Sequence, residues 1–213
     1  MSRRAVFLDR DGVINSYYYN SKLGTVDSPS NPDEFELVPG VSEAIASFHK
    51  MGILIIVVSN QPGIAKGKFS AELLRATTDK MMDACGGNID AVYYCLHHPK
   101  ALHPLYGQEC ECRKPRPGLI LQAAAEWDID LSRSVMIGDR LTDVVAGKDA
   151  GTQTILIGDA ESRASEAMET HLAIPDFMAA TLADTVTIVN KLFFSKKTTM
   201  QGEWQYELRC DIH

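Results

Sequence analysis

Short runs of apolar residues, separated by polar and turn residues, recur along the chain and predict β-strands. Ile53–Val58 (ILIIVV) is continuous and rich in β-branched residues, which is typical of a strand buried on both faces of a sheet. The predicted strands are Ala5–Leu8, Ile53–Val58, Ala91–Tyr94, Val135–Ile137 and Thr154–Ile157.

Between these runs, apolar residues recur at the spacing of one helical face. The first such segment stops at Gly52, and Ser70 is a predicted N-cap for the second. The predicted helices are Val41–Met51, Ser70–Cys85, Pro117–Trp127, Leu141–Ala150 and Leu182–Phe193.

Strands and helices alternate, and this order predicts an α/β fold with a doubly wound, mostly parallel sheet and helices on both faces. We expect one domain over residues 1–194 and a C-terminal tail over 195–213. Two segments lack periodicity, Ser16–Pro39 and His97–Pro117, and long loops of this kind are often functional. Neither leaves room for a separate cap domain.

The composition is that of an ordinary globular protein: 213 residues with a formal net charge of −7. This acidity argues against binding nucleic acid through net charge. No apolar run is long enough to span a membrane, and the N-terminal segment reaches acidic Asp9 too soon for a signal peptide. We therefore expect a cytoplasmic, monomeric protein without nucleic-acid or membrane partners.

Acidic residues follow two of the predicted strands. Asp9–Gly12 (DRDG) comes after the first strand, and Asp139 and Asp143 come after the run that ends at Ile137. The carboxyl ends of parallel strands share one edge of a sheet, so these carboxylates should converge, and oxygen ligands of this kind suit Mg²⁺. A carboxylate can also attack phosphorus. The alternative for Asp9–Gly12 alone is a capped surface turn.

Neutral and basic groups complete this edge. Ser59, Asn60 and Gln61 follow another strand and offer donors for phosphate oxygens, and Arg113 and Lys114 supply fixed positive charge.

Five cysteines are an odd number for a disulfide framework in a reducing compartment. Cys95, His97, Cys110 and Cys112 have a spacing that suits a closed, tetrahedral Zn²⁺ site. Because Cys112 immediately precedes Arg113 and Lys114, such a metal would position the lysine without taking part in the chemistry.

Other residues in this loop leave the ligand set open. His98 and His103 are rival ligands; His97 is favoured because Cys-x-His mirrors Cys-x-Cys. Cys85 and Cys210 fit no metal spacing, and Cys85 is predicted to be a small buried hydrophobe.

Four segments together carry a resemblance to a known family. Phe7–Gly12 (FLDRDG), Val58–Gln61 (VSNQ), Lys114-Pro115 and Gly138–Asp143 (GDRLTD) resemble, in order, the four motifs of the haloacid dehalogenase superfamily. The resemblance implies a phosphatase on the fold expected above.

The resemblance also implies roles. Asp9 would be the nucleophile that forms an aspartyl-phosphate, and Asp11 would protonate the leaving oxygen and then activate water. A proton on Asp11 at one step requires a pKa above that of Asp9. Ser59 and Lys114 would hold the transferring phosphoryl group.

For the metal, the resemblance implies that Mg²⁺ is held by Asp9, Asp139 and the backbone carbonyl of Asp11. Asp143 would orient Lys114 or the waters on the metal.

The zinc pattern and Ser59–Phe69 (SNQPGIAKGKF) are similar to the heptose bisphosphate phosphatase family. This implies hydrolysis of the 7-phosphate of D-glycero-D-manno-heptose 1,7-bisphosphate, in bacterial surface (lipopolysaccharide) biosynthesis. Histidinol phosphate or another small sugar phosphate is the alternative substrate. A zinc-bearing module without activity is disfavoured because the acidic motifs and Lys114 are intact, and a polynucleotide phosphatase is disfavoured by the acidic charge.

Without a cap, loops must exclude water and select the substrate. Arg113 is the favoured site for a second phosphate, because guanidinium binds phosphate in a bidentate manner, with Lys66 and Lys68 as alternatives. The residues predicted to contact substrate are Tyr17, Tyr18, Tyr19, Asn20, Asn60, Gln61, Pro62, Arg113 and Arg140.

Overall fold

The structure of the protein is a computed structural model, and it describes residues 2–21, 24–158 and 174–194. The predicted tail, 195–213, and Cys210 within it lie outside the described residues. Among the helices in these ranges, none combines the length and the apolar character that crossing a bilayer requires.

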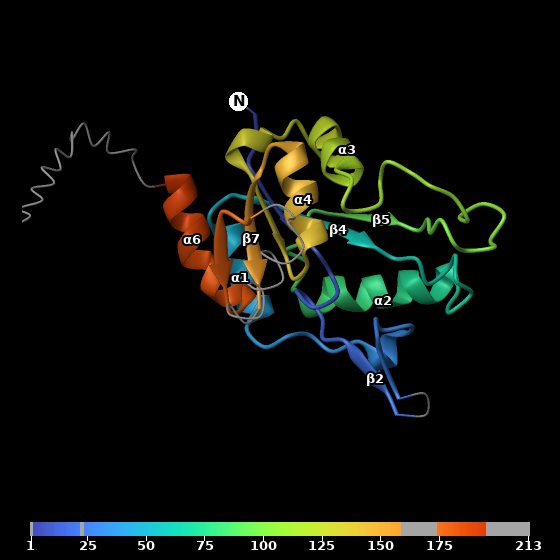
Figure 1. Cartoon of the computed structure of the whole chain (residues 1–213). Coiled ribbons are helices and arrows are strands. Elements are labelled where there is room, and N and C mark those ends of the chain that lie inside the picture. The colour runs from blue at the N-terminus through green and yellow to red at the C-terminus, as the bar shows by residue number, and fades with distance from the viewer. Residues whose placement is uncertain (1, 22–23, 159–173, 195–213) are drawn as a thin grey trace, which may run out of the picture.

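A six-stranded parallel sheet forms the centre of the molecule, in the order β5-β4-β1-β6-β7-β8 (Figure 1). The chain starts at an inner strand and winds outward in both directions, which confirms the predicted doubly wound fold. The strands are β1 (Ala5–Leu8), β4 (Leu54–Asn60), β5 (Ala91–Cys95), β6 (Val135–Gly138), β7 (Gln153–Ile157) and β8 (Phe177–Ala179).

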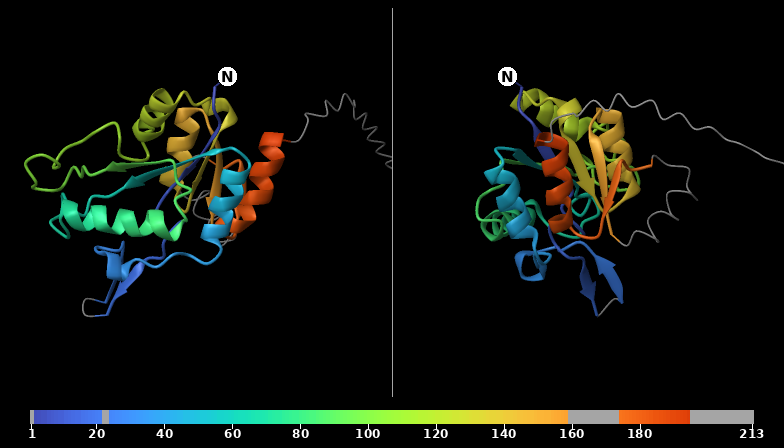
Figure 2. Two further views of the ribbon diagram at one scale, coloured as in Figure 1. Left: turned by 180° about the vertical axis from the view of Figure 1, so that it is seen from behind. Right: turned by 90° about the vertical axis from the view of Figure 1, so that its left-hand side faces the viewer.

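Helices cover both faces of the sheet, with α1 and α6 on one side and α4 on the other (Figure 2). Along β1, Val6 and Leu8 belong to the core on one face, and Ala5 and Phe7 belong to the core on the other, because successive side chains of a strand point in opposite directions. The helices of the first face are α1 (Val41–Lys50), α2 (Ala71–Ala84) and α6 (Leu182–Phe194); those of the second are α3 (Gly118–Trp127) and α4 (Leu141–Ala150).

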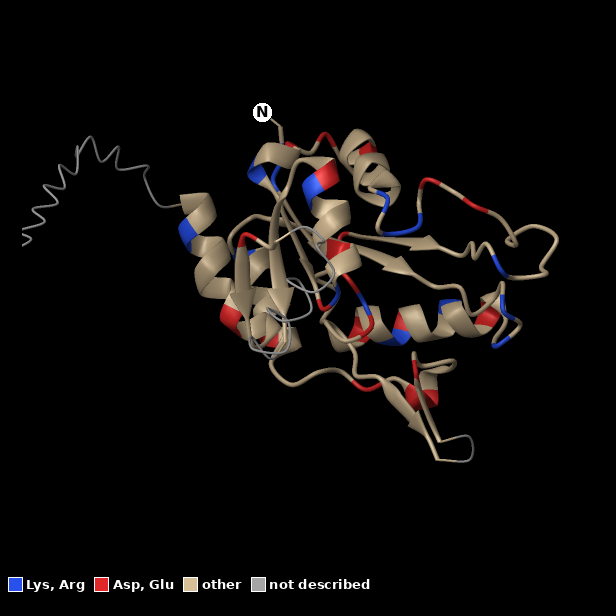
Figure 3. Cartoon of the chain, viewed as in Figure 1, with Lys and Arg blue, Asp and Glu red and all other residues tan. Residues whose placement is uncertain are grey.

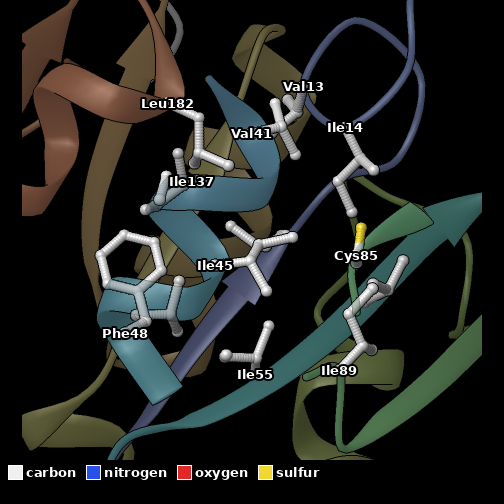
Figure 4. Close-up of a cluster of buried hydrophobic side chains, with 14 of the residues drawn as sticks. Val13, Ile14, Val41, Ile45, Phe48, Ile55, Cys85, Ile89, Ile137 and Leu182 are labelled. Atoms are coloured by element: carbon white, nitrogen blue, oxygen red, sulfur yellow. The ribbon is translucent and has the colours of Figure 1, made fainter. Parts of the chain in front are cut away.

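The larger core lies under α1, where Ile45 and Phe48 meet Ile55 and Ile137 of the sheet (Figure 4). All four side chains are fully buried, and each contributes about 1.5–3 kcal/mol to folding. Cys85 is buried in the same core, as predicted, and burial raises the pKa of its thiol to about 11.

The segment Ser16–Pro39, expected to be a loop, contains a two-stranded antiparallel hairpin of β2 (Tyr18–Asn20) and β3 (Thr25–Asp27), followed by a 3-10 turn, η1 (Pro32–Glu34). The hairpin projects from the body of the molecule near α2 (Figure 1). Its strands are short and largely exposed, so they carry no alternation of apolar and polar residues that a sequence pattern could reveal.

The other unpredicted elements are the edge strand β8, which is three residues long and only half-buried, and a second 3-10 turn, η2 (Leu131–Arg133). The remaining predicted strands and helices are present, with ends that differ by one or two residues. One difference matters for function: β4 continues to Asn60, so Ser59 and Asn60 are the last residues of a strand and not part of the following loop.

Candidate active site

Three neighbouring strands, β4, β1 and β6, bring polar residues to one edge of the sheet. Asp9 directly follows β1 and Asp139 directly follows β6, while Ser59 is near the end of β4. The amide of Asp9 donates to the carbonyl of Ile137 (3.0 Å), so the strand ladder continues to the acidic residue. All three side chains are buried, which places two carboxylates and a hydroxyl close together away from bulk water. In Figure 3, acidic and basic residues are spread over the loops and helices of the molecule, including the loops at this end of the sheet.

A cluster of three buried carboxylates forms here from Asp9, Asp139 and Asp143, with one oxygen of each within 4.8 Å of the others. Asp143 lies in the first turn of α4, where its Oδ2 accepts a hydrogen bond from the amide of Arg140 (3.0 Å). Burial raises the pKa of Asp143 to about 6, with Asp9 and Asp139 adding to the rise against the opposing charge of Lys114. This donor set of crowded hard oxygens fits Mg²⁺.

Lys114 reaches into this cluster from the loop before α3. Its ammonium group lies 3.0 Å from Asp9 and 2.6 Å from Asp143, and it donates to the carbonyl of Val58 (2.8 Å). Burial alone would lower the pKa of Lys114, but the two carboxylates raise it, so the group stays charged. The amide group of Asn60 pairs with the backbone N–H and C=O of Lys114 (both 3.0 Å) and fixes the lysine from the sheet side.

The carboxylate of Asp11 faces a different set of partners. Oδ1 accepts from Nε and Nη2 of Arg10 (3.0 and 2.9 Å) and from Asn15 (3.0 Å), and Oδ2 accepts from Gln61 (2.7 Å). Burial would raise the pKa of Asp11, but Arg10 and the hydrogen bonds lower it overall. This arrangement holds Asp11 as a carboxylate, whereas the role of proton donor needs it to carry a proton at one step.

A pocket of about 280 Å³ opens above the carboxylates. A second pocket of about 270 Å³ lies beside it, between the hairpin and the segment 61–69, and Lys66 is among the residues that line both. The first pocket is lined by Asp9, Asp11, Tyr17, Asp27, Ser28, Ser59, Asn60, Pro62, Lys66, Arg113, Lys114, Arg140, Thr142 and Asp143. The second is lined by Tyr18, Asn20, Asp27, Ser28, Ser30, Glu34, Gln61, Pro62, Gly63, Lys66, Lys68 and Phe69.

Most residues predicted to contact substrate line one of these pockets, but several already have other partners. Gln61 is buried and donates to Asp11 and to the hydroxyl of Ser59 (3.3 Å). Arg113 lines the first pocket and donates to the carbonyl of His97 (3.1 Å). Tyr19 lines neither pocket and is 61% exposed on the hairpin.

Tyr17 and Arg140 form a linked pair at the wall of the first pocket. The hydroxyl of Tyr17 donates to Oδ2 of Asp139 (2.9 Å) and accepts from Arg140. Burial and the charge of Asp139 raise the pKa of Tyr17 above its ordinary value.

Five residues of this site were not predicted from the sequence. Arg10 belongs to the segment Asp9–Gly12, and its full burial is not evident from the sequence because this segment has the composition of a polar turn. Asn15 contacts Asp11 from four residues further along, a spacing that could have been noticed. The others reach the pocket through the hairpin and the start of α4; they are Asp27, Ser28 and Thr142.

A second cluster joins Cys95, His97, Cys110 and Cys112, as the spacing predicted. The three sulfur atoms lie 3.3–3.6 Å apart, and Nδ1 of His97 is 3.3 Å from the sulfur of Cys112. Ligands of a tetrahedral Zn²⁺ with Zn–S distances of about 2.3 Å are separated by roughly 3.8 Å, so the set is close to the required size. Burial and the neighbouring thiols raise the pKa of Cys95.

The rival histidines face elsewhere. Nδ1 of His98 accepts from the amide of Lys100 (3.2 Å), and Nδ1 of His103 accepts from the amides of Leu105 and Tyr106. The geometry therefore favours His97 as the fourth member of the cluster.

Comparison with known proteins agrees with this site. Residues 111–185 match the family model described as HAD-hydrolase-like. The D-glycero-β-D-manno-heptose-1,7-bisphosphate 7-phosphatase of Vibrio cholerae is 42% identical over 162 residues, which cover 74% of this chain and 82% of the relative. The protein of the same name from Haemophilus ducreyi is 34% identical over 196 residues, covering 89% of this chain and all of the relative.

A solved structure is also similar: D,D-heptose 1,7-bisphosphate phosphatase from B. bronchiseptica, complexed with magnesium and phosphate. It has a TM-score of 0.73 and 30% sequence identity, and the match covers 88% of this chain and 98% of that one.

Asp9 and Asp139 directly follow two central strands of a parallel sheet, Ser59 lies near the end of a third, and Lys114 lies among the carboxylates. This arrangement defines a phosphatase of the haloacid dehalogenase type. Within that class, the chain belongs to the family of the heptose bisphosphate 7-phosphatases.

Proposed function

We propose that the protein hydrolyses the 7-phosphate of D-glycero-D-manno-heptose 1,7-bisphosphate. One observation carries this proposal: the buried cluster of Asp9, Asp139, Asp143 and Lys114 occurs in a chain that is 42% identical to a phosphatase of that name. A cytoplasmic location and a monomeric state remain predictions.

The proposed reaction has two steps. Asp11 is held as a carboxylate before substrate binds, so it must first take up a proton from solvent. A carboxylate oxygen of Asp9 then attacks the phosphorus of the 7-phosphate, and the bond between phosphorus and the sugar oxygen breaks as Asp11 gives that oxygen its proton. Asp11, now a carboxylate, then takes a proton from a water molecule that attacks the phosphorus. The bond to Asp9 breaks, and inorganic phosphate leaves.

Two residues would stabilise the phosphoryl group during both steps. The ammonium group of Lys114 is held by Asp9 and Asp143, so its charge lies next to the nucleophile before any substrate binds. The hydroxyl of Ser59 is fixed by Gln61 beside the same place. Groups that are positioned in advance stabilise the charge of a transition state most effectively.

Asp9 and Asp139, with the backbone carbonyl of Asp11, would hold Mg²⁺. When bound, the metal supplies positive charge that neutralises the phosphoryl oxygens. Asp143 is less suited as a direct ligand because both of its oxygens are used, by Lys114 and by the amide of Arg140.

Cys95, His97, Cys110 and Cys112 would hold Zn²⁺ in a site of four protein ligands, which is typical of a structural metal. The loop that carries them leads directly to Lys114 and is braced by Arg113, which donates to His97. The metal would therefore keep the loop in the shape that directs Lys114 at Asp9.

A second phosphate on the substrate would meet Arg113 and Lys66, which line the first pocket together with the carboxylates. Both cations also act on His98, whose pKa is lowered by burial and by the charges of Lys66, Arg113 and Lys100. Lys68 is less available because it forms an ion pair with Asp27 of the hairpin.

Phosphorus NMR tests the proposal. With Mg²⁺ and heptose 1,7-bisphosphate, the 7-phosphate resonance should disappear while the 1-phosphate resonance remains. An Asp9→Asn variant should show no turnover, whereas Asp79→Asn on the exposed side of α2 should behave as wild type. Loss of the 1-phosphate first, or an active Asp9→Asn variant, would contradict the proposal.

A further inference from the structure

Tyr17 lies between two charged residues that come from a distant part of the chain. Its hydroxyl oxygen is 2.9 Å from Oδ2 of Asp139. The same oxygen is 3.0 Å from Nη2 and 3.3 Å from Nε of Arg140, whose guanidinium group also stacks on the tyrosine ring at 5.6 Å. One phenol thus contacts both residues that follow β6.

The direction of these hydrogen bonds is fixed by chemistry. A guanidinium group only donates, so both contacts with Arg140 use lone pairs of the Tyr17 oxygen. A phenol has a single hydrogen, and the remaining partner, Asp139, is an acceptor. The hydroxyl hydrogen therefore points at Oδ2 of Asp139, and the charge of Arg140 strengthens this bond by polarising the hydroxyl.

The turn after Asp11 packs against this bond. Gly12 has φ +85°, and a Cβ atom at this position would lie 2.4 Å from Oδ2 of Asp139 and 2.9 Å from Cε2 of Tyr17. No side chain fits there, so the backbone of the nucleophile segment closes over the contact between Tyr17 and Asp139. The same turn that follows Asp9 and Asp11 thus holds the phenol and the carboxylate together.

We propose that Tyr17 is a positioning residue for the magnesium site, and that its hydroxyl holds the carboxylate of Asp139 in the orientation that binds the metal. The inference rests on the proposed function, which assigns Asp139 to Mg²⁺. It gives Tyr17 a task other than the sugar contact expected from the sequence. The substrate would then be selected by residues of the first pocket other than Tyr17.

The expected loss of Mg²⁺ affinity on removing the Tyr17 hydroxyl can be taken from what is typical of other metal sites. Removing a hydrogen-bond partner of a metal ligand typically weakens metal binding about 10–100-fold, because the ligand must then be ordered when the metal binds. The substrate should bind normally once the metal site is full, since the phenol is engaged with Asp139 and Arg140.

The test compares Tyr17→Phe with wild type in the full chain. The phenylalanine ring keeps the packing on Gly12 and Arg140, and Tyr93→Phe is the matched control because its hydroxyl bonds to Glu126 and Trp127, away from the site. Calorimetric titration with Mg²⁺ alone should give a Kd at least tenfold higher for Tyr17→Phe and unchanged for Tyr93→Phe. At saturating Mg²⁺, KM for the sugar bisphosphate should stay within twofold of wild type.

An unchanged Kd for Mg²⁺ in Tyr17→Phe would overturn the inference. A raised KM at saturating Mg²⁺ in the same variant would instead support the contact between Tyr17 and the sugar that was expected from the sequence. A third protein, Asp139→Asn, separates this failure from failure of the proposed function. If Asp139→Asn binds Mg²⁺ as tightly as wild type, the assignment of Asp139 to the metal is itself wrong, and the inference falls with it.

Discussion

The ammonium group of Lys114 lies 2.6 Å from Oδ1 of Asp143 and 3.0 Å from Oδ1 of Asp9, with all three side chains buried. The lysine is therefore held at the nucleophile by a residue of α4, although it belongs to the loop after the cysteine cluster. Two separate parts of the chain must be in place before the positive charge can act.

Replacing Lys114 removes the fixed cation at the phosphoryl site. Lys114→Met should lower kcat/KM about 10²–10³-fold, the cost typical of losing one preorganised transition-state contact. Steady-state kinetics at saturating Mg²⁺ measure this. Lys50→Met, on the exposed end of α1, is the matched control and should keep full activity. A loss smaller than fivefold in Lys114→Met would show that the lysine does not contact the phosphoryl group.

The pair of Arg10 and Asp11 should contribute to stability. Both residues are almost completely buried, and Arg10→Met leaves the carboxylate of Asp11 without its charged partner. Breaking a buried ion pair from one side costs about 3–5 kcal/mol, and we expect a decrease of about 3 kcal/mol in the free energy of unfolding because Asn15 and Gln61 still bond to Asp11.

Urea unfolding of four proteins checks this expectation: wild type, Arg10→Met, Asp11→Asn and the double variant. The double variant should recover part of the loss, since no unpaired charge remains. Losses that simply add would contradict the pairing. Arg133→Met, at an exposed arginine, should change the stability by less than about 0.5 kcal/mol.

The cysteine cluster should bind zinc and support the loop that carries Lys114. Metal analysis of the purified protein should find about one zinc per chain, and Cys112→Ser should lose most of it. Because the loop is then no longer held together by the metal, kcat and the unfolding temperature should both fall. Cys85→Ala should keep its zinc because this cysteine lies in the core under α1 and α2. Full activity in a zinc-free Cys112→Ser protein would remove the proposed link to Lys114.

Much of the fold and of the candidate site could be predicted from the sequence, for local reasons. Strands buried on both faces read as continuous apolar runs, and Asp9 and Asp139 follow such runs directly. The cysteine cluster was visible because its ligand spacing is characteristic. In each of these cases a short segment carries the whole signal.

The rest depends on contacts between distant segments, which no local pattern reveals. The hairpin is short and contains no buried residue, and its segment is closed by a bridge between Asn15 and Leu37, which are 22 positions apart. The bond between Tyr17 and Asp139 joins residues 122 positions apart. The role of Asn60 in holding the backbone of Lys114 was likewise invisible, since an amide after a strand also suits phosphate binding.

Lys66 should recognise the second phosphate of the substrate. It lines both pockets, whereas its neighbour Lys68 is engaged with Asp27. Lys66→Ala should raise KM for the bisphosphate about tenfold, equivalent to about 1.4 kcal/mol, and should change KM for the corresponding 7-monophosphate little. Lys68→Ala should have the smaller effect on the bisphosphate. Equal changes in KM for the bisphosphate and the 7-monophosphate in Lys66→Ala would show that this lysine does not bind the second phosphate.

The most direct test of the account is the ratio of kcat/KM values for heptose 1,7-bisphosphate and histidinol phosphate, measured with the full chain and saturating Mg²⁺. The two compounds separate the proposed substrate from its nearest alternative. A pocket lined by Lys66 and Arg113 as well as by the carboxylates should favour the bisphosphate by more than tenfold, or about 1.4 kcal/mol of transition-state stabilisation. A tenfold preference for histidinol phosphate would contradict the account.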